Sequence, residues 1–158
     1  MEKAQLKRIF EFLEDKEEQN PPIKWKLLNN EPLLEDDLDI KGDLNLWACD
    51  VKSLPEGLKV GGVLILEYST IQTLPEGLKV GGNLSLYYCK HLTSLPKGLK
   101  VGGGLSLRYT SITLLPKGLK VKGDLYIRNT SLEDYTDDEL IEMVKPGFIK
   151  GEIIRKWL

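Results

Sequence analysis

The chain has 158 residues, 41% of them hydrophobic and 29% charged, which is the composition of one soluble globular domain. It contains neither the roughly 18 consecutive apolar residues of a membrane span nor an apolar leader, and its two cysteines cannot form a disulfide framework, so we expect a cytoplasmic protein. The net charge of −2 is unevenly distributed, because residues 41–132 hold 12 bases and 6 acids, whereas acids outnumber bases by 11 to 6 in residues 1–40 and by 7 to 4 in residues 133–158.

The first segment with a clear periodicity is residues 3–18, which we predict to be an amphipathic helix. Its apolar side chains recur at the spacing of one helix face, at Leu6, Ile9, Phe10 and Leu13. Prolines at positions 21 and 22 end it, because proline lacks a backbone donor and restricts the residue before it. Residues 23–28 should lead into the first repeat and pack beneath it. We interpret residues 1–33 as an N-terminal cap of a repeat array; the alternative is a helix that docks on a partner.

The centre of the chain repeats one unit with a period of about 20 residues. The unit reads Leu-Pro-Glu/Lys-Gly-Leu-Lys-Val, and its copies start 20, 21 and 20 residues apart, at Leu54, Leu74, Leu95 and Leu115. A more divergent copy starts at Leu34. Such a period is typical of a solenoid, in which a coil buries its apolar face only by stacking on its neighbours. We therefore predict a solenoid over residues 34–134, within a single domain that spans residues 1–158.

Each coil contains a Leu-x-Leu pair that predicts a short strand with both leucines pointing inward, as at Leu84 and Leu86. Glycines such as Gly81 and Gly82 precede the pair and predict a tight corner. Stacking should align the strands into one parallel sheet, with neighbours about 4.8 Å apart. The strands are expected at residues 44–47, 64–67, 84–87, 105–108 and 125–128. The returning limb of each coil covers one face of this sheet, and the other face is left free.

The repeat resembles the leucine-rich repeat, specifically the short bacterial type of 20 residues with a Leu-Pro dipeptide. The signature L-x-x-L-x-L-x-x-N/C-x-L corresponds to Leu84, Leu86 and Cys89, with Leu92 displaced by an insertion. Glycine or lysine replaces the first leucine of the signature, and the asparagine becomes Cys49, Ser69, Cys89, Thr110 and Thr130. These small polar side chains are expected to form a hydrogen-bonded ladder between coils. The chain is also similar to short repeat proteins of bacteriophages and mobile elements, which implies a bacterial or phage-infected host cell.

The end of the chain, residues 135–158, is predicted to be a C-terminal cap. Thr136 and Glu139 form a capping box at the start of a helix, and Pro146 ends that helix. The segment 149–153 then repeats the apolar spacing of the earlier coils and should form a sixth, incomplete coil. The predicted fold is an α/β repeat solenoid, a leucine-rich-repeat-like stack of five to six coils with one parallel β-sheet. An N-terminal helix and a C-terminal helix plus strand cap it.

The sequence offers little for catalysis or metal binding. His91 is the only histidine, so neither a histidine-based triad nor a histidine metal cluster can form. Cys49 and Cys89 stand two coils apart, about 10 Å at strand spacing, which is too far for a disulfide. The glycines of residues 101–104 lack the Gly-Lys-Ser/Thr that follows in a phosphate-binding loop. We therefore predict a protein that is not an enzyme and takes no metal, cofactor or small-molecule substrate.

One basic column repeats with the coils and consists of Lys59, Lys79, Lys100 and Lys120. Like charges aligned about 5 Å apart repel each other, which is unfavourable unless they are solvated. One interpretation of this column is a solubilising face that discourages aggregation. The other is a site for an anionic surface, a nucleic acid or an acidic protein.

The free face of the predicted sheet carries larger and more variable side chains. Tyrosine, tryptophan and arginine gather there, and these residue types are enriched at interaction hot spots. The core positions barely change between coils, whereas these positions change in size and charge. The candidate partner-binding residues are Trp47, Ile65, Glu67, Tyr68, Tyr87, Tyr88, Arg108, Tyr109, Tyr126 and Arg128. Cross-strand packing that only stabilises the sheet is the alternative interpretation.

These patterns predict a non-enzymatic module that presents its sheet to another protein. The phage-like resemblance implies an inhibitor or modulator of a host protein. The alternative is a nucleic-acid-binding protein that uses the arginines and tyrosines of the sheet together with the lysine column. Binding of that kind would weaken steeply with salt, because phosphate contacts release counterions.

Overall fold

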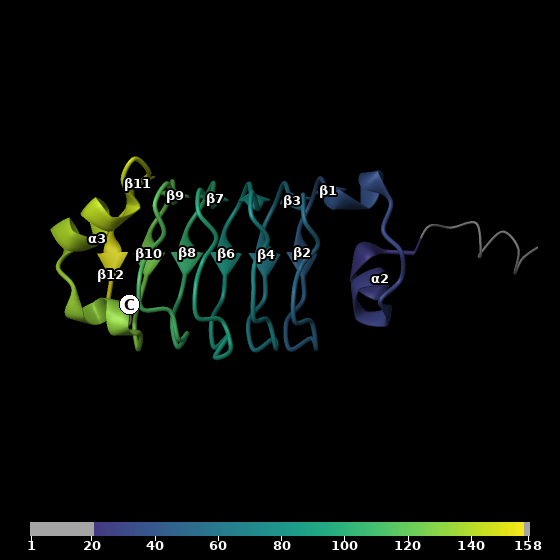
Figure 1. Ribbon diagram of the computed structural model, residues 1–158, viewed down its shortest axis with the longest axis horizontal. Helices are drawn as coiled ribbons and strands as arrows, with labels where there is room; N and C mark the ends of the chain where they lie inside the picture. The colour runs from purple at the N-terminus through teal and green to yellow at the C-terminus, as the bar shows by residue number, and fades with distance from the viewer. Residues whose placement is uncertain (1–20, 157–158) are drawn as a thin grey trace, which may run out of the picture.

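The computed structural model describes residues 21–156, which form a solenoid of coils stacked side by side along one axis (Figure 1). Equivalent strands of successive coils are parallel and about 20 residues apart in the sequence, as Leu64 and Leu84 are. The predicted repeat architecture is therefore confirmed. The helix predicted at residues 3–18 lies outside the described residues.

Each coil contributes one two-residue strand to each of two parallel sheets. Sheet A has the order β1, β3, β5, β7, β9, β11, with bounds Asp39–Ile40, Lys59–Val60, Lys79–Val80, Lys100–Val101, Lys120–Val121 and Phe148–Ile149. Sheet B has the order β2, β4, β6, β8, β10, β12, with bounds Leu44–Asn45, Leu64–Ile65, Leu84–Ser85, Leu105–Ser106, Leu125–Tyr126 and Ile153–Ile154. Equivalent residues pair across both sheets, so each repeat position forms a column along the solenoid axis.

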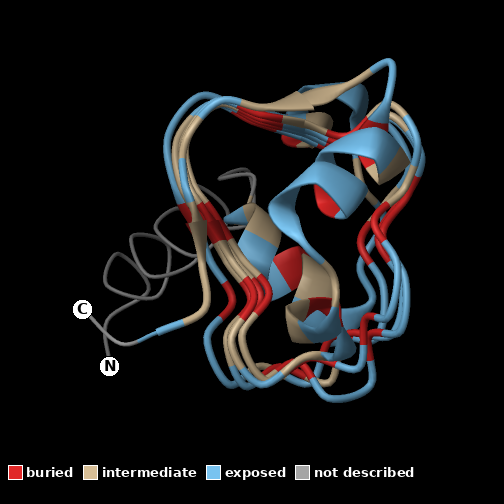
Figure 2. Ribbon diagram, turned by 90° about the vertical axis from the view of Figure 1, so that its left-hand side faces the viewer, coloured by how far each residue is buried: buried red, intermediate tan, exposed pale blue. Residues whose placement is uncertain are grey.

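The prediction of a single sheet is wrong, because the Lys-Val pair of each repeat forms a second sheet. The valine of this pair is buried and the lysine faces outward. The backbone N–H of Lys120 donates to the carbonyl oxygen of Leu99 in the preceding coil at 2.9 Å. Two residues are too few for the alternation of a strand to be visible in a sequence. The two sheets occupy neighbouring sides of the coil in the view along the axis (Figure 2).

Leucine side chains fill the inside of every coil. Leu84 and Leu86 are completely buried, whereas Ser85 between them is only partly covered. Leu92, which the one-residue insertion displaces, is also completely buried. The inward and outward positions of the Leu-x-Leu pair are therefore as predicted.

Glycines and polar side chains build the corner that joins sheet A to sheet B. A methyl group at Gly102 would lie 2.1 Å from the carbonyl oxygen of Gly81, so no side chain fits there. Just before sheet B, side-chain oxygens of one coil accept hydrogen bonds from backbone N–H groups of the next coil. These oxygens belong to Asp43, Asn83 and Asp124, at 2.7, 2.8 and 2.9 Å. The corner thus links successive coils and fixes the two outer faces relative to each other.

The N-terminal end of the solenoid is covered by the helix α2, Ile23–Asn29, and the 3-10 helix η1, Glu35–Leu38. Ile23 and Leu27 pack against the core, as expected for this lead-in segment. Lys26 and Asp37 form an ion pair at 2.5 Å with side chains only 5% and 6% exposed. This ion pair links α2 to η1. Removing either partner would leave an uncompensated buried charge and would therefore destabilise this end of the solenoid.

The C-terminal end closes both sheets. The helix α3, Asp137–Val144, follows the 3-10 helix η2, Ser131–Asp134. It begins at the predicted capping box, where Thr136 Oγ1 accepts from the N–H of Glu139 and the Glu139 carboxylate accepts from the N–H of Thr136. After α3, β11 joins sheet A and β12 joins sheet B. The predicted incomplete coil is therefore present, and it extends two sheets instead of one.

The expected ladder of small polar side chains is only partly continuous between coils. The Cys89 thiol donates to the carbonyl oxygen of Leu66 in the preceding coil at 3.0 Å and lies 3.8 Å from the Ser69 hydroxyl. Thr110 and Thr130 instead donate to the carbonyl oxygens three residues earlier in their own coils. Threonine hydroxyls commonly bond locally in this way, which satisfies them without a neighbouring coil.

Candidate binding surface

The outer face of sheet B and the turns that leave it carry all ten residues predicted to bind a partner. Stacking of the coils places them in three columns. The first column is the second residue of each sheet-B strand, the second is the residue after the Leu-x-Leu pair, and the third is the residue that follows it. The first column contains Ile65 and Tyr126, the second contains Trp47, Glu67, Tyr87, Arg108 and Arg128, and the third contains Tyr68, Tyr88 and Tyr109. The solenoid therefore collects these residues on one side of the molecule.

Five of the ten residues form one continuous group of rings, which we call the aromatic cluster: Trp47, Tyr68, Tyr87, Tyr88 and Tyr109. Neighbouring ring centroids are 5.0 Å apart for Tyr68 and Tyr88, 5.5 Å for Tyr87 and Tyr109, and 6.3 Å for Trp47 and Tyr68. Most pairs are edge-to-face or tilted, which are the favourable arrangements for aromatic rings. Trp47 is 56% exposed and Tyr68 is 46% exposed. Tyr87, Tyr88 and Tyr109 are half-buried, so the solvent-exposed ring surface of the cluster lies mainly at Trp47 and Tyr68.

Three tyrosines of the cluster have a left-handed backbone. The φ angles are 57° at Tyr68, 61° at Tyr88 and 58° at Tyr109, and Asn129 has φ 54° at the same position of the next coil. This conformation costs a residue with a side chain about 1–2 kcal/mol, and asparagine tolerates it better than tyrosine. The turn itself therefore gives no reason for tyrosine. Ala48, with φ 52° in the first coil, adopts the same conformation, so the left-handed backbone belongs to this turn in all five coils and by itself assigns no role to the rings.

Charged groups border the aromatic cluster. The Arg108 guanidinium lies 4.4 Å from the ring centre of Tyr126, a cation–π contact that holds the arginine flat on the sheet. Lys90 Nζ lies 4.2 Å from the ring centre of Tyr88. A side-chain hydrogen bond with Tyr87 raises the pKa of the Tyr68 phenol above its ordinary value. The surface therefore combines aromatic rings with cations at its border.

A groove of about 530 Å³ lies beside the aromatic cluster on the same face, and we call it the sheet-B groove. Ile65 and Tyr126 stand at its two ends, and Ser85 and Ser106 form the floor between them. Glu67, Asn83 and Asp124 also line it. Sequence reasoning missed this groove, although the signal was there in two consecutive serines of one column between an isoleucine and a tyrosine.

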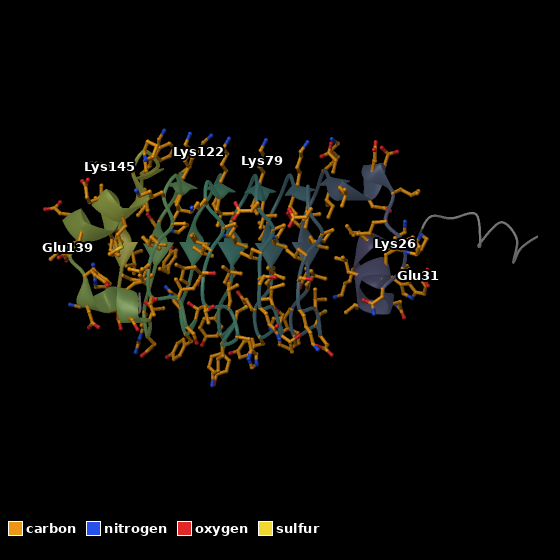
Figure 3. The ribbon with its side chains drawn as sticks, viewed as in Figure 1. Lys26, Glu31, Lys79, Lys122, Glu139 and Lys145 are labelled. Atoms are coloured by element: carbon orange, nitrogen blue, oxygen red, sulfur yellow. The ribbon has the colours of Figure 1, made fainter. Side chains whose placement is uncertain are left out.

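The lysine column lies on sheet A and not on sheet B. Lys59, Lys79, Lys100 and Lys120 pair in register on consecutive strands, and we call them the lysine row. Lys79 and, further along, Lys122 project toward the same side of the solenoid (Figure 3). The structure therefore separates the lysine row from the arginines and tyrosines, which occupy a neighbouring side. A nucleic acid that used both sets, which was the alternative interpretation, would have to contact two neighbouring sides of the solenoid.

Within residues 21–156, no three histidine, cysteine, aspartate or glutamate side chains are placed to hold a metal ion. Burial raises the pKa of the Cys89 thiol, which makes it a poor nucleophile. Asp43 and Asp124 are each engaged in the corner of a different coil. No helix in this part of the chain is long and apolar enough to cross a membrane.

Comparison with known proteins gave no relative. No protein-family model matches the chain, and no curated protein or solved structure matches it either.

Proposed function

We propose that this protein is a non-enzymatic binding module that presents the outer face of sheet B to another protein. The observation that carries the proposal is the aromatic cluster, in which five rings contact one another on one side of the solenoid, with Trp47 and Tyr68 exposed and the other three rings half-buried. Tyrosine, tryptophan and arginine supply most hot spots of protein interfaces, because a large rigid side chain buries much area at a low cost in conformational entropy. The cluster and Arg108 provide all three residue types on one side.

The sheet-B groove favours a protein as the partner, because the groove makes this face uneven and the uneven surface of a folded protein can fit into it. A segment of the partner seated between Ile65 and Tyr126 would contact Ser85 and Ser106 while its flanks cover the cluster. Six strands about 4.8 Å apart extend about 24 Å, a length that suits an interface of about 800 Å² per partner. We therefore place the centre of the interface at Tyr87, which belongs to the cluster, and at Arg108 in the next coil.

We also propose, from resemblance, a relation to the short bacterial leucine-rich repeats and to repeat proteins of bacteriophages. Leu84, Leu86 and Cys89 hold the buried positions that the repeat signature requires, which supports the relation. The departures are the second sheet and the glycine corners. In this setting the protein acts in the cytoplasm of a bacterial or infected cell as an inhibitor or modulator of a host protein.

Affinity capture from the source cell tests the proposal. The full chain serves as bait, beside a variant with Tyr87→Ala and Arg108→Ala, and each capture is repeated after nuclease treatment. We expect a protein that is retained by the parent chain, lost with the variant and unaffected by nuclease. Retention by both baits would show that sheet B is not the binding face, and loss after nuclease would show that a nucleic acid mediates the capture. Circular dichroism must first show that both baits are equally folded.

A further inference from the structure

Sheet A carries a second surface of different character. The lysine row runs along its outer face, and strand register brings consecutive lysines to about 4.8 Å, the spacing of neighbouring strands. In the strand register, Asp39 lies opposite Lys59 at one end of the row, and Phe148 lies opposite Lys120 at the other end. The row therefore places one lysine on each of four successive coils.

The charges of this array are not balanced within the described part of the chain. No acidic side chain of residues 21–156 forms an ion pair with Lys79, Lys100 or Lys120, and Asp39 beside Lys59 is paired with Lys41. Like charges directly opposite on neighbouring strands destabilise a sheet. A surface that serves only solubility mixes charges of both signs and avoids this cost. The uniform row thus favours a ligand that supplies the missing negative charge.

A groove of about 280 Å³ follows the row and defines where such a ligand would lie. Lys79, Lys100 and Lys120 form its wall, and Lys122 and Phe148 lie at its C-terminal end. Gly81 and Gly102 form its floor, where the corner geometry excludes side chains. Lys59 does not line it. Its lining spans three neighbouring columns, those of the lysines, valines and glycines, over three coils and onto Phe148.

We propose that this sheet-A groove binds the phosphate backbone of single-stranded nucleic acid. A strand with one negative charge at every nucleotide matches an array with one positive charge at every coil. Lysine acts on phosphate as a mobile point charge, whereas planar carboxylates are better recognised by the fork of arginine, so the row favours phosphate over an acidic protein. An anionic membrane also attracts lysines, but it presents a broad surface, whereas these lysines form the wall of a groove. Phe148, half-buried with Lys150 Nζ 5.3 Å from its ring centre, adds an aromatic surface for a base at the C-terminal end of the groove. The site is independent of the proposed function, because it lies on the other sheet.

Fluorescence anisotropy with labelled hexathymidylate tests this site directly. Four phosphate contacts predict a plot of log affinity against log salt with a slope of about −3, since single strands give about −0.7 for each contact. The affinity should thus fall about fiftyfold between 50 and 200 mM salt. The triple variant Lys79→Gln, Lys100→Gln, Lys120→Gln leaves one contact, so its affinity should fall only about threefold over the same range and should be well below that of the parent at 50 mM.

Two matched controls locate the site. Lys59→Gln removes the same charge from the same row outside the groove, and it should change hexathymidylate binding much less than Lys100→Gln. Tyr87→Ala alters sheet B and should leave oligonucleotide binding unchanged. Absence of binding by the parent at 50 mM salt, or equal binding by the triple variant, would overturn the proposal. Binding to phosphatidylserine vesicles without binding to hexathymidylate would assign the row to membranes instead. None of these failures affects sheet B, whose partner is tested by capture.

Discussion

The two sheets of this solenoid share one backbone plan but differ in the side chains that they present. The outward position of sheet A is lysine in four consecutive strands. The equivalent position of sheet B changes from strand to strand, through Asn45, Ile65, Ser85, Ser106 and Tyr126. Because strand pairing gives every residue of a column the same backbone surroundings, the difference between the two faces cannot come from the fold.

This difference indicates what each face would recognise. A column of identical residues repeats one interaction at a fixed spacing, which suits a regular polymer. A column of different residues creates hollows and projections, such as the groove over Ser85 and Ser106, and these suit the irregular surface of a folded protein. The left-handed turns that leave sheet B carry tyrosine in three consecutive coils but Ala48 and Asn129 in the coils on either side, so this column also varies along the solenoid.

The largest expected effect contrasts the inner and outer sides of sheet B. Leu86→Ala should lower the free energy of unfolding by about 2–5 kcal/mol, because it leaves a cavity among completely buried side chains. Ser85→Ala, one residue away on the outer side, should stay within about 0.5 kcal/mol. Urea denaturation of both variants measures the contrast. Equal losses would show that the outer face of sheet B contributes to the core and is not free for a partner.

The corner between the faces gives the next largest effect. Gly102→Ala places a methyl group 2.1 Å from the carbonyl oxygen of Gly81, so the backbone must shift, and we expect a loss of about 1–3 kcal/mol or more. Gly42→Ala, at the corner of the first coil, has no atom within 4 Å of the new methyl group and should cost nothing or stabilise slightly. Thermal melting distinguishes the two variants. Similar melting temperatures would mean that glycine is not required where the coils turn from sheet A to sheet B.

A smaller effect is expected at the strained turns of sheet B. Tyr109→Asn relieves part of a left-handed strain of about 1–2 kcal/mol but loses two ring contacts worth about 0.5–1.5 kcal/mol each, so the net loss of stability should be no more than about 2 kcal/mol. Denaturant unfolding measures it. A loss of several kcal/mol would show that the aromatic cluster is retained for stability, which was the alternative interpretation of the sequence.

The smallest expected effect concerns the C-terminal cap, which lies at the end of both sheets. The N–H of Thr136 lowers the pKa of the Glu139 carboxylate in the folded protein. A carboxylate whose pKa is lower in the folded than in the unfolded protein stabilises the folded state at pH values above its pKa in the unfolded protein. This stabilisation is lost as the pH falls through the pKa of the folded protein. The melting temperature of Glu139→Gln should therefore be slightly below that of the parent at pH 7 and should converge with it near pH 3. Divergence toward low pH would contradict the capping box.

The sequence was sufficient to predict the solenoid, because its repeats are strong, but it was insufficient to predict the second sheet. Leu84 and Leu86 mark a strand by their alternation, whereas Lys79 and Val80 form a strand of only two residues. The left-handed backbone of Tyr68 and its neighbours also left no sequence signal, since tyrosine is not a residue that such turns favour. The aromatic cluster could be predicted only as a column, because contacts between columns depend on how far each ring leans along the sheet.

The claim that the two faces have separate roles is tested most directly with the captured protein partner. Its dissociation constant is measured for the parent chain and for variants of each face. Tyr87→Ala and Arg108→Ala should each weaken binding about tenfold or more, largely through faster dissociation, as truncations at the centre of an interface do. Lys79→Ala and Lys100→Ala, on the other sheet, should weaken it less than about fivefold, with the change confined to the association rate at low salt. All four variants must melt like the parent. If the lysine variants lose binding and the sheet-B variants keep it, the proposed protein-binding face is wrong.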